Sequence, residues 1–327
     1  MRADRHLPVC DYEGSAYRTE FWGQGRDYED AAERVALETM LPPTGRRLID
    51  IGGGYGRLVP LYRGYDEVII FDYALSQLRE AQALWGTEQP DGPQNLTYVA
   101  GDFYHLPFAP ATFDTVVIVR ALHHAADAPA VLRNVSQLLA GRGTLILEFA
   151  NKRNLKAIIR YLLGRQAWSP FDTEPVEFVP LNFDFHPKWI RDTLANHRLL
   201  IQDRRAVSSF RLAFLKRHVP THVLVTLDRI VQPLGGRLPL SPSVFLRCQV
   251  DQDASPVSEG PPLRCTACGS TRLNRGDSVL RCGVCGSSFP IRGGIPDFRF
   301  SGQLRHRPIS EPSRAQATNT WEPTDAN

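Results

Sequence analysis

The chain has 327 residues, of which 43% are hydrophobic and 22% charged, and its formal net charge is +3. This composition supports a full globular core, and so small a net charge does not by itself indicate a nucleic-acid partner. The apolar runs are short, so we expect no transmembrane segment. The N-terminal "MRADRHLPVCDYEG" has no apolar stretch after its basic residues, so we expect no secretory signal and a cytoplasmic location.

Expected strands and helices alternate between residues 46 and 150. Short apolar runs rich in β-branched residues, bounded by Gly, Asp or Pro, predict strands at 46–52, 67–72, 96–102, 113–122 and 143–150. Between them, "LSQLREAQALWG" and "APAVLRNVSQLLAG" have helical spacing, and each helix is expected to end at its glycine. Continuous apolar strands separated by helices predict an α/β fold with a doubly wound, mostly parallel sheet.

The pattern is weaker after residue 150. "HPKWIRDTLANHRLLIQDRRAVSS" predicts a helix and then a strand, and "SPSVFLRCQV" predicts a final strand. Between these two strands we expect a helical insertion at about 210–240, broken at Pro220. The composition of residues 251–262 is typical of a linker, and that of residues 301–327 is typical of a disordered tail.

The first expected strand leads into a glycine-rich loop, "DIGGGYGRL". In it Asp50 is followed by Gly52, Gly54 and Gly56. Glycine lets the backbone turn sharply and approach a ligand without a Cβ in the way. A dinucleotide fingerprint, G-x-G-x-x-G, fails whether it is counted from Gly52 or from Gly54, and a G-K-[ST] phosphate loop is absent. A tight turn without a ligand is the plainer alternative.

This D-x-G-x-G-x-G pattern resembles motif I of class I S-adenosylmethionine-dependent methyltransferases of the type 11-like group. Asp72, followed by Tyr73, matches the acid that binds the ribose hydroxyls in that family. Asp102 and Phe103 in "AGDFYHLPF" match its adenine-binding segment. The resemblance covers residues 12–150 well and implies a Rossmann-like, seven-stranded sheet with S-adenosyl-L-methionine as cofactor. For either acid alone, a helix N-cap or a surface carboxylate is the alternative.

An N-terminal lid is expected at about residues 10–40. In related methyltransferases an N-terminal helix folds over the cofactor, and this segment has an unusual density of aromatic residues. Tyr17 and Trp22 are therefore candidates for the cofactor cover. The alternative is that they attach the segment to the core.

The end of the fourth expected strand, "FDTVVIVRALHH", resembles the family segment that faces the methyl group. Transfer from a sulfonium is an in-line displacement, so the enzyme mainly aligns the reactants and excludes water. Histidine suits a general base because its pKa is near neutral, and His124 is preferred over His123. Packing in the core is the alternative for either histidine. Arg120 would hold an anionic acceptor group or pair with a neighbouring acid.

Two later segments are candidates to cover the acceptor. Residues 151–165 form a basic amphipathic pattern, which is typical of peripheral membrane contact or of a helix that packs on its own domain. The insertion at about 210–240 has a similar character. His186 and Trp189 lie in an aromatic-rich stretch and would line the acceptor pocket or pack in the core.

Four of the six cysteines form C-x2-C-x13-C-x2-C, with a glycine after each pair: Cys265, Cys268, Cys282 and Cys285. The x2 spacing lets two thiolates point at one ion, and four thiolates make a closed tetrahedral site. The pattern therefore predicts structural Zn²⁺, with an iron centre or two disulfides as alternatives. Cys10 and Cys248 stand apart and need no role.

Residues 263–300, which include "FPIRGGIPDF", resemble the small zinc-ribbon partners of methyltransferases that modify tRNA, rRNA and translation release factors. We therefore expect a methyltransferase domain at 1–250, a linker at 251–262 and a zinc ribbon at 263–300. A small-molecule or lipid-like acceptor is preferred, because the catalytic domain resembles the branch that includes quinone methyltransferases. Methylation of RNA or of a translation protein, and a non-catalytic cofactor-binding scaffold, are the alternatives. "RALH" stands where an N-P-P-Y-type tetrapeptide is expected for a planar nitrogen acceptor.

Overall fold

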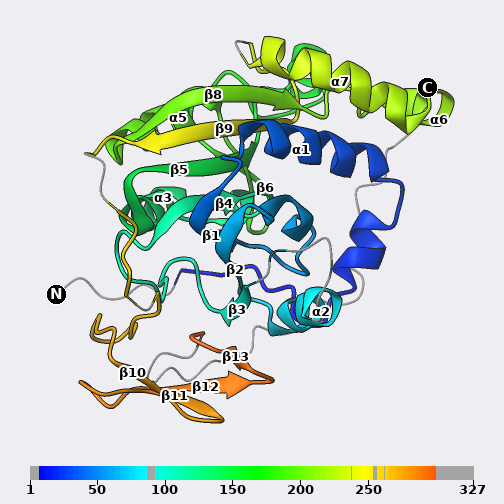
Figure 1. Cartoon of the computed structure of the whole chain (residues 1–327). Coiled ribbons are helices and arrows are strands. Elements are labelled where there is room, and N and C mark those ends of the chain that lie inside the picture. Colours follow the sequence, from blue (N-terminus) through cyan, green and yellow to red (C-terminus); the bar gives the residue numbers. More distant parts are fainter. Residues whose placement is uncertain are drawn as a thin grey trace.

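The computed structural model describes residues 7–86, 93, 95–236, 238–252, 256–260 and 262–299 (Figure 1). The predicted disordered tail at 301–327 lies outside these residues. The strands are β1 Gly45–Ile51, β2 Tyr65–Asp72, β3 Leu96–Ala100, β4 Phe113–Ile118, β5 Leu139–Ala150, β6 Val176–Val179, β7 Asn182–Asp184, β8 Leu199–Val207, β9 Ser243–Val250, β10 Leu273–Arg275, β11 Val279–Cys282, β12 Ser288–Arg292 and β13 Ile295–Pro296. The longer helices are α1 Asp27–Met40, α2 Leu75–Trp85, α3 Ala128–Leu138, α4 Leu155–Leu162, α5 Pro187–Asn196, α6 Ala213–His218 and α7 Thr221–Gly235. Short helical turns are η1 Tyr17–Trp22, η2 Val59–Tyr62 and η3 Leu122–His124.

Seven strands form one sheet in the order β3-β2-β1-β4-β5-β9-β8. Neighbouring strands from β3 to β5 run parallel, and β9 is antiparallel to both β5 and β8. The predicted doubly wound, mostly parallel α/β sheet is confirmed. The chain leaves β1 for β2 on one side and returns to β4 on the other, so a crevice is expected at the carboxyl ends of these strands.

Helices cover both faces of the sheet because successive strand residues point to opposite faces. Leu48 and Val117 belong to a core cluster with side chains of α1, α2 and α7. Ile49 and Val116 belong to the cluster on the other face, which includes side chains of α3 and α5. Each face is therefore closed by its own helical layer. Among the described residues, no helix is long and apolar enough to cross a membrane.

The end of α3 differs from the expectation. The helix was predicted to end at Gly141, but it ends at Leu138 and β5 begins at the next residue. Amide groups of the loop before β4 donate hydrogen bonds to carbonyl oxygens in the last turn of α3. Ala111 N donates to Gln137 O at 3.0 Å, and Thr112 N donates to Leu138 O at 2.9 Å. A tertiary contact thus replaces the glycine cap.

The cysteine-rich segment folds as a four-stranded sheet, β10-β11-β12-β13, which lies beside the β3 edge of the large sheet (Figure 1). Asp297 forms a parallel bridge with Ala100, and Phe298 N donates to Ala100 O at 2.8 Å. Phe298 packs against Phe289, with ring centroids 4.6 Å apart, and both belong to the same core cluster as Phe71. This small sheet shares a hydrophobic core with the large domain.

The segment predicted as a linker is also bonded to the large domain. Ser258 N donates to Ala111 O at 3.0 Å, and Arg47 Nη1 donates to Ser258 O at 3.3 Å. Ala109 N donates to Pro262 O at 2.9 Å. The chain is therefore held along the large domain before it enters the small sheet.

Phe298→Ala should destabilise the whole protein, because it opens a cavity where the two parts share a core. We expect a loss of about 3 kcal/mol or more in the free energy of unfolding. The control is Val284→Ala, whose side chain is 60% exposed, and a change within about 0.5 kcal/mol is expected. Thermal unfolding measures both variants. A Phe298→Ala protein as stable as the wild type would contradict the shared core.

Candidate active site and metal centre

The loop after β1 adopts backbone conformations that favour glycine. Gly52, Gly54 and Gly56 have φ of +77°, +51° and +76°. A Cβ on Gly52 would lie 2.4 Å from the Cβ of Ala121, and a Cβ on Gly56 would lie 3.0 Å from Trp85. Gly52 and Gly56 are therefore required by close packing as well as by conformation, and the loop bends sharply at the carboxyl edge of the sheet.

Asp72 at the end of β2 fixes this loop. Its Oδ2 accepts a hydrogen bond from Gly54 N at 2.9 Å, and its Oδ1 accepts one from Ala74 N at 2.8 Å. Burial raises the pKa of Asp72 to about 6, against the effect of these backbone donors. A carboxylate has about four lone-pair sites, so each oxygen can still accept a hydrogen bond from a ligand.

Asp50 lies at the end of β1, behind the loop. It is buried, and its Oδ2 accepts a hydrogen bond from the Tyr62 hydroxyl at 2.8 Å. Burial raises the pKa of Asp50 to about 7. An incoming hydrogen-bond donor or cation would favour the ionised forms of both Asp50 and Asp72.

Two adjoining cavities open at this edge of the sheet. The lining of the larger includes eight predicted site residues: Tyr17, Gly52, Gly54, Asp72, Tyr73, Phe103, Arg120 and His124. The smaller is lined in part by Trp22 and Asp50 and shares Tyr17, Gly52, Gly54 and Arg120 with the first. A wider, open hollow beside Arg142 and Arg198, near the far ends of β8 and β9, includes none of the predicted residues.

Three of the predicted cofactor-binding and catalytic residues do not line either cavity: Gly56, Asp102 and His123. Asp102 Oδ1 accepts from Tyr104 N at 2.8 Å, and its Oδ2 pairs with His105 Nδ1 at 2.9 Å. The carboxylate therefore shapes the turn that carries Phe103 into the larger cavity. The ring of His123 packs at an angle of 46° against that of His124, with ring centroids 3.9 Å apart.

The N-terminal segment lies across the site. Glu13 accepts hydrogen bonds from Leu75 N at 2.8 Å and Ser76 N at 3.1 Å, which caps the first turn of α2 from outside. Tyr17 lines both cavities and stacks on Phe21, with ring centroids 5.0 Å apart. This arrangement places the predicted cover residue Tyr17 directly over the loop.

Trp22 is held between two arginines. The guanidinium carbon of Arg57 lies 4.0 Å from the ring centroid, and that of Arg120 lies 4.8 Å from it. Both arginines bind Glu33, which is fully buried: Arg57 Nη2 donates to its Oε2 at 2.8 Å, and Arg120 Nε donates to its Oε1 at 2.8 Å. Burial acts to raise the pKa of Glu33, but the two guanidinium groups lower it below its ordinary value. Of the two roles expected for Arg120, pairing with an acid is the one observed.

His124 has both ring nitrogens engaged. Its Nδ1 lies 2.9 Å from the carbonyl oxygen of Leu181 and must donate to it, so Nε2 carries the lone pair. The Tyr12 hydroxyl, 3.0 Å from Nε2, is therefore the donor to that nitrogen. Burial lowers the pKa of His124 below its ordinary value, although the bond to Leu181 acts in the opposite direction. His124 is thus a neutral base whose lone pair faces Tyr12 at the larger cavity.

Several residues of the site were not predicted from the sequence: Cys10, Tyr12, Glu33, Tyr62 and Gln77. The aromatic density of the N-terminal segment is the one sequence feature that includes Tyr12. It does not indicate that Tyr12 contacts His124, which lies 112 residues away. His186 and Trp189, by contrast, pack in the domain. His186 Nδ1 accepts from Lys188 N at 3.1 Å at the start of α5, and Trp189 stacks on Phe185 with ring centroids 5.4 Å apart.

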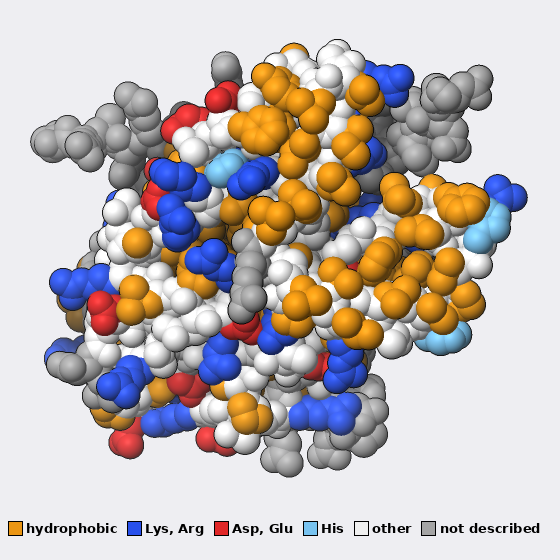
Figure 2. Space-filling view, turned by 90° about the horizontal axis from the view of Figure 1, so that it is seen from above, with side chains coloured by type: hydrophobic (Ala, Val, Ile, Leu, Met, Phe, Trp, Pro, Cys, Tyr) orange, Lys and Arg blue, Asp and Glu red, His pale blue; other side chains and the backbone are white. Residues whose placement is uncertain are grey.

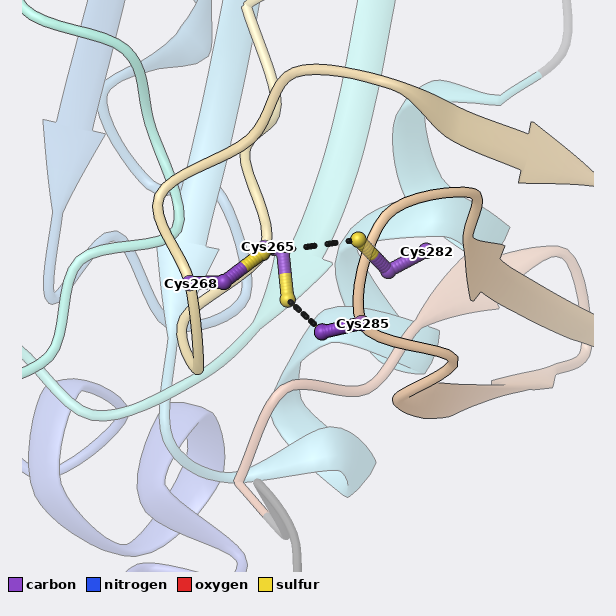
Figure 3. A group of neighbouring side chains, drawn as sticks. All are labelled: Cys265, Cys268, Cys282 and Cys285. Carbon is purple, nitrogen blue, oxygen red and sulfur yellow. Dashed lines mark hydrogen bonds between the residues drawn. The ribbon is translucent and has the colours of Figure 1, made fainter.

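The four cysteines of the small sheet converge on one point (Figure 3). Their sulfur atoms all lie within 4.8 Å of one another, and the Cys265–Cys285 and Cys268–Cys282 pairs are each 3.6 Å apart. A disulfide requires about 2.05 Å, so neither close pair is bonded. Thiolates about 2.3 Å from one zinc ion lie about 3.8 Å from each other, so this set is compatible with a tetrahedral zinc ribbon.

The backbone of each cysteine pair is built for such a site. Gly269 and Gly286 have φ of +75° and +76°, and their amides donate to the carbonyls of Cys265 and Cys282 at 2.8 and 3.0 Å. Val284 N lies 3.4 Å from Cys282 Sγ, where it donates to the sulfur. Amide donation of this kind stabilises a thiolate.

Comparison with known proteins supports this description. Residues 49–147 match the family model of a methyltransferase domain. The chain is 30% identical over 122 residues to a 27-O-demethylrifamycin SV methyltransferase of Amycolatopsis mediterranei, which covers 36% of this chain and 45% of that protein. It is 28% identical over 169 residues to the ubiquinone/menaquinone biosynthesis C-methyltransferase UbiE of Pseudomonas syringae pv. syringae, with 47% and 64% covered. The chain thus spans less than two thirds of the length of these relatives.

A solved structure shares the fold. It is a chain of the complex between the Haloferax volcanii Trm112 methyltransferase activator and a methyltransferase, with a TM-score of 0.50 and 16% sequence identity. The likeness covers 72% of this chain and 97% of that chain. Residues 49–147 thus match a methyltransferase-domain model, and β8 and β9 complete the seven-stranded sheet.

Proposed function

We propose that this protein is an S-adenosyl-L-methionine-dependent methyltransferase that acts on a small-molecule or lipid-like acceptor. One observation carries the proposal. Asp72 and the glycine loop face one side of a cavity whose other side holds the neutral base His124. The proposed cofactor-binding residues and a base thus line the same cavity.

The residues present fit the cofactor. Each oxygen of Asp72 can accept a further hydrogen bond, as two neighbouring ribose hydroxyls require. Phe103 and Gly101 offer an apolar wall for an adenine ring in the larger cavity, and the smaller cavity beside Asp50 would hold the amino-acid part. When bound, S-adenosyl-L-methionine supplies a methyl group already activated on a sulfonium.

The chain's own residues would align the reactants and handle one proton. Tyr17 lines both cavities and would help to exclude water once the ligands are bound. His124 Nε2 would accept a proton from the acceptor as the new bond to carbon forms, with the acceptor group displacing the Tyr12 hydroxyl as its partner. This chemistry suits a hydroxyl or an acidic carbon.

The charges around the cavity favour a neutral acceptor. Arg120, the cation that lines the larger cavity, is already paired with the buried Glu33. An anionic acceptor would have to compete with that carboxylate for the guanidinium. The names of the two relatives, a rifamycin methyltransferase and a quinone-pathway methyltransferase, agree with a small, largely apolar acceptor.

We also propose that the cysteine-rich sheet binds structural zinc and stabilises the cofactor side of the site. Arg299, which follows this sheet, donates to Tyr73 O and to Glu13 Oε2, both at 3.2 Å, and is held by Asp297 at 2.8 Å. It therefore connects the small sheet to the cavity wall and to the N-terminal cover. The similar fold from a complex with a methyltransferase activator supports an activating role over an acceptor-binding one.

Asp72→Ala should weaken the binding of S-adenosyl-L-methionine by about tenfold or more, because the ribose loses its acceptor. The cofactor should bind the protein in which Asp50 and Asp72 are both ionised. Because the pKa of Asp72 is raised to about 6 and that of Asp50 to about 7, the affinity for S-adenosyl-L-methionine should be highest above pH 7 and fall as the pH is lowered through this range. Titration calorimetry measures both effects. Asp192→Ala, an exposed acid on α5, is the control, and unchanged binding by Asp72→Ala would refute the cofactor assignment.

His124→Asn should reduce methyl transfer by about 100-fold or more while cofactor affinity stays close to that of the wild type. Because the pKa of His124 lies below its ordinary value, the midpoint of the acidic fall in the wild-type rate should lie below that of a free histidine. The assay follows labelled methyl groups into an organic-solvent extract. His197→Asn is the control, and an unaltered rate in His124→Asn would show that no base is required there.

Metal removal should weaken cofactor binding without abolishing it. Elemental analysis should find one zinc per chain, and a chelator should lower both the melting temperature and the affinity for S-adenosyl-L-methionine. Arg299→Ala should keep the zinc but bind the cofactor a few-fold more weakly, unlike the control Arg272→Ala. If the metal-free protein bound S-adenosyl-L-methionine with full affinity, the proposed support of the cofactor site by the small sheet would be wrong.

A further inference from the structure

Helix α7 is packed with its polar side inward. Its buried residues are Leu224, Asp228 and Gln232. Asp228 accepts from the Tyr28 hydroxyl at 3.0 Å, and Gln232 Nε2 donates to Ala32 O at 2.9 Å, so both polar groups are satisfied against α1. The apolar side therefore faces outward.

The outward side of α7 exposes large apolar residues. Ile230 is 60% exposed and Leu234 is 68% exposed. A helix that only covers its own domain places its apolar stripe toward the core. This helix does the reverse, which is typical of a surface that meets an apolar partner.

Helices α4 and α6 continue the same surface. Among the residues of α4 only Ala157 is buried, while Leu162 is 71% exposed. Helix α6 has no buried residue, and its Phe214 is 70% exposed. Figure 2 shows hydrophobic side chains gathered on this side of the molecule. Of the 17 large apolar residues that are exposed in the described chain, all but Val284 lie between residues 155 and 238.

The charges of these three helices have one sign at the surface. Together α4, α6 and α7 contain five lysines and arginines: Lys156, Arg160, Lys216, Arg217 and Arg229. Of these, Lys216 is paired with Glu29 of α1, to which its Nζ donates at 2.9 Å. Their acidic residue is Asp228, which is fully buried. Exposed apolar side chains bordered by cations are the pattern of helices that lie in the interface of an anionic membrane. Two copies of the same face would bring like charges together, which disfavours a dimer through it.

This surface adjoins the acceptor side of the site. Leu181, between β6 and β7, accepts the hydrogen bond from His124, and the same hairpin exposes Phe178 by 49%. Arg211, just before α6, lies 4.0 Å from Glu33, which binds Arg120. The cysteine-rich sheet lies at the opposite edge of the large sheet (Figure 1).

We propose that α4, α6 and α7 form a lipid-docking face that places the protein on an anionic membrane, with its acceptor side toward the bilayer. The apolar side chains would enter the interface while the basic residues contact anionic headgroups. A lipid-like acceptor would then reach His124 from the membrane without crossing water. This inference rests on the proposed lipid-like acceptor.

Co-sedimentation of the full chain with vesicles tests the proposal. The wild type should bind phosphatidylcholine vesicles that contain phosphatidylglycerol, and should bind about tenfold less without the anionic lipid or at high salt. Phe214→Ser with Leu234→Ser, and separately Lys156→Glu with Arg160→Glu, should each reduce binding about tenfold. The controls, Val284→Ser and Arg281→Glu, make the same changes on the cysteine-rich sheet and should bind as the wild type does.

Vesicle binding tests the docking face, whereas methyl transfer and cofactor binding test the proposed function, so that either can fail without the other. Cofactor titration on the same samples checks that each variant is folded, and the lipid and salt dependence of the wild type needs no variant. The docking proposal would be overturned if the wild type bound no vesicles. It would also be overturned if the wild type bound no vesicles but formed a dimer that the Ser variants dissociate. Neither result would contradict the proposed methyltransferase function. Salt-sensitive vesicle binding lost in both double variants would sustain it, even if no methyl group enters lipid and the proposed acceptor is wrong.

Discussion

The hydrogen bond from Gly54 N to Asp72 Oδ2, at 2.9 Å, ties the carboxyl ends of β1 and β2 together. It holds the glycine loop in conformations with positive φ, and it leaves the Asp72 carboxylate directed at the cavity. Because the acid is a structural partner and, in our proposal, the acceptor for the ribose hydroxyls, loop shape and cofactor affinity would depend on one group. The burial that raises the pKa of Asp72 also makes its hydrogen bonds strong.

The two ends of the large sheet would serve different sides of the proposed reaction. At the β3 edge, Phe298 and Arg299 connect the cysteine-rich sheet to the wall of the proposed cofactor pocket. Toward the β8 edge, α7 and α6 carry part of the proposed lipid-docking face. Between them, the ion cluster around Glu33 holds Trp22 and the N-terminal cover in place. The proposed chemistry therefore lies between a metal-stabilised edge and a membrane-facing edge.

Local patterns predicted the sheet and the glycine loop because apolar periodicity and turn geometry are encoded over a few residues. The pair formed by Tyr12 and His124 spans 112 positions and arises only from tertiary packing, so the sequence could not indicate it. The same holds for the end of α3, where loop amides replace a glycine cap. Helical spacing predicted the insertion around Pro220, but periodicity does not show that α7 turns its polar side inward.

Methyl transfer to an apolar acceptor can be followed with labelled cofactor. The full chain is incubated with S-adenosyl-L-methionine labelled in its methyl group and with fractionated cell extract. We expect label in the lipid fraction, and loss of that label in Asp72→Ala and His124→Asn. Label that appears in RNA or protein instead, or that is unaffected by both substitutions, would contradict the proposed function.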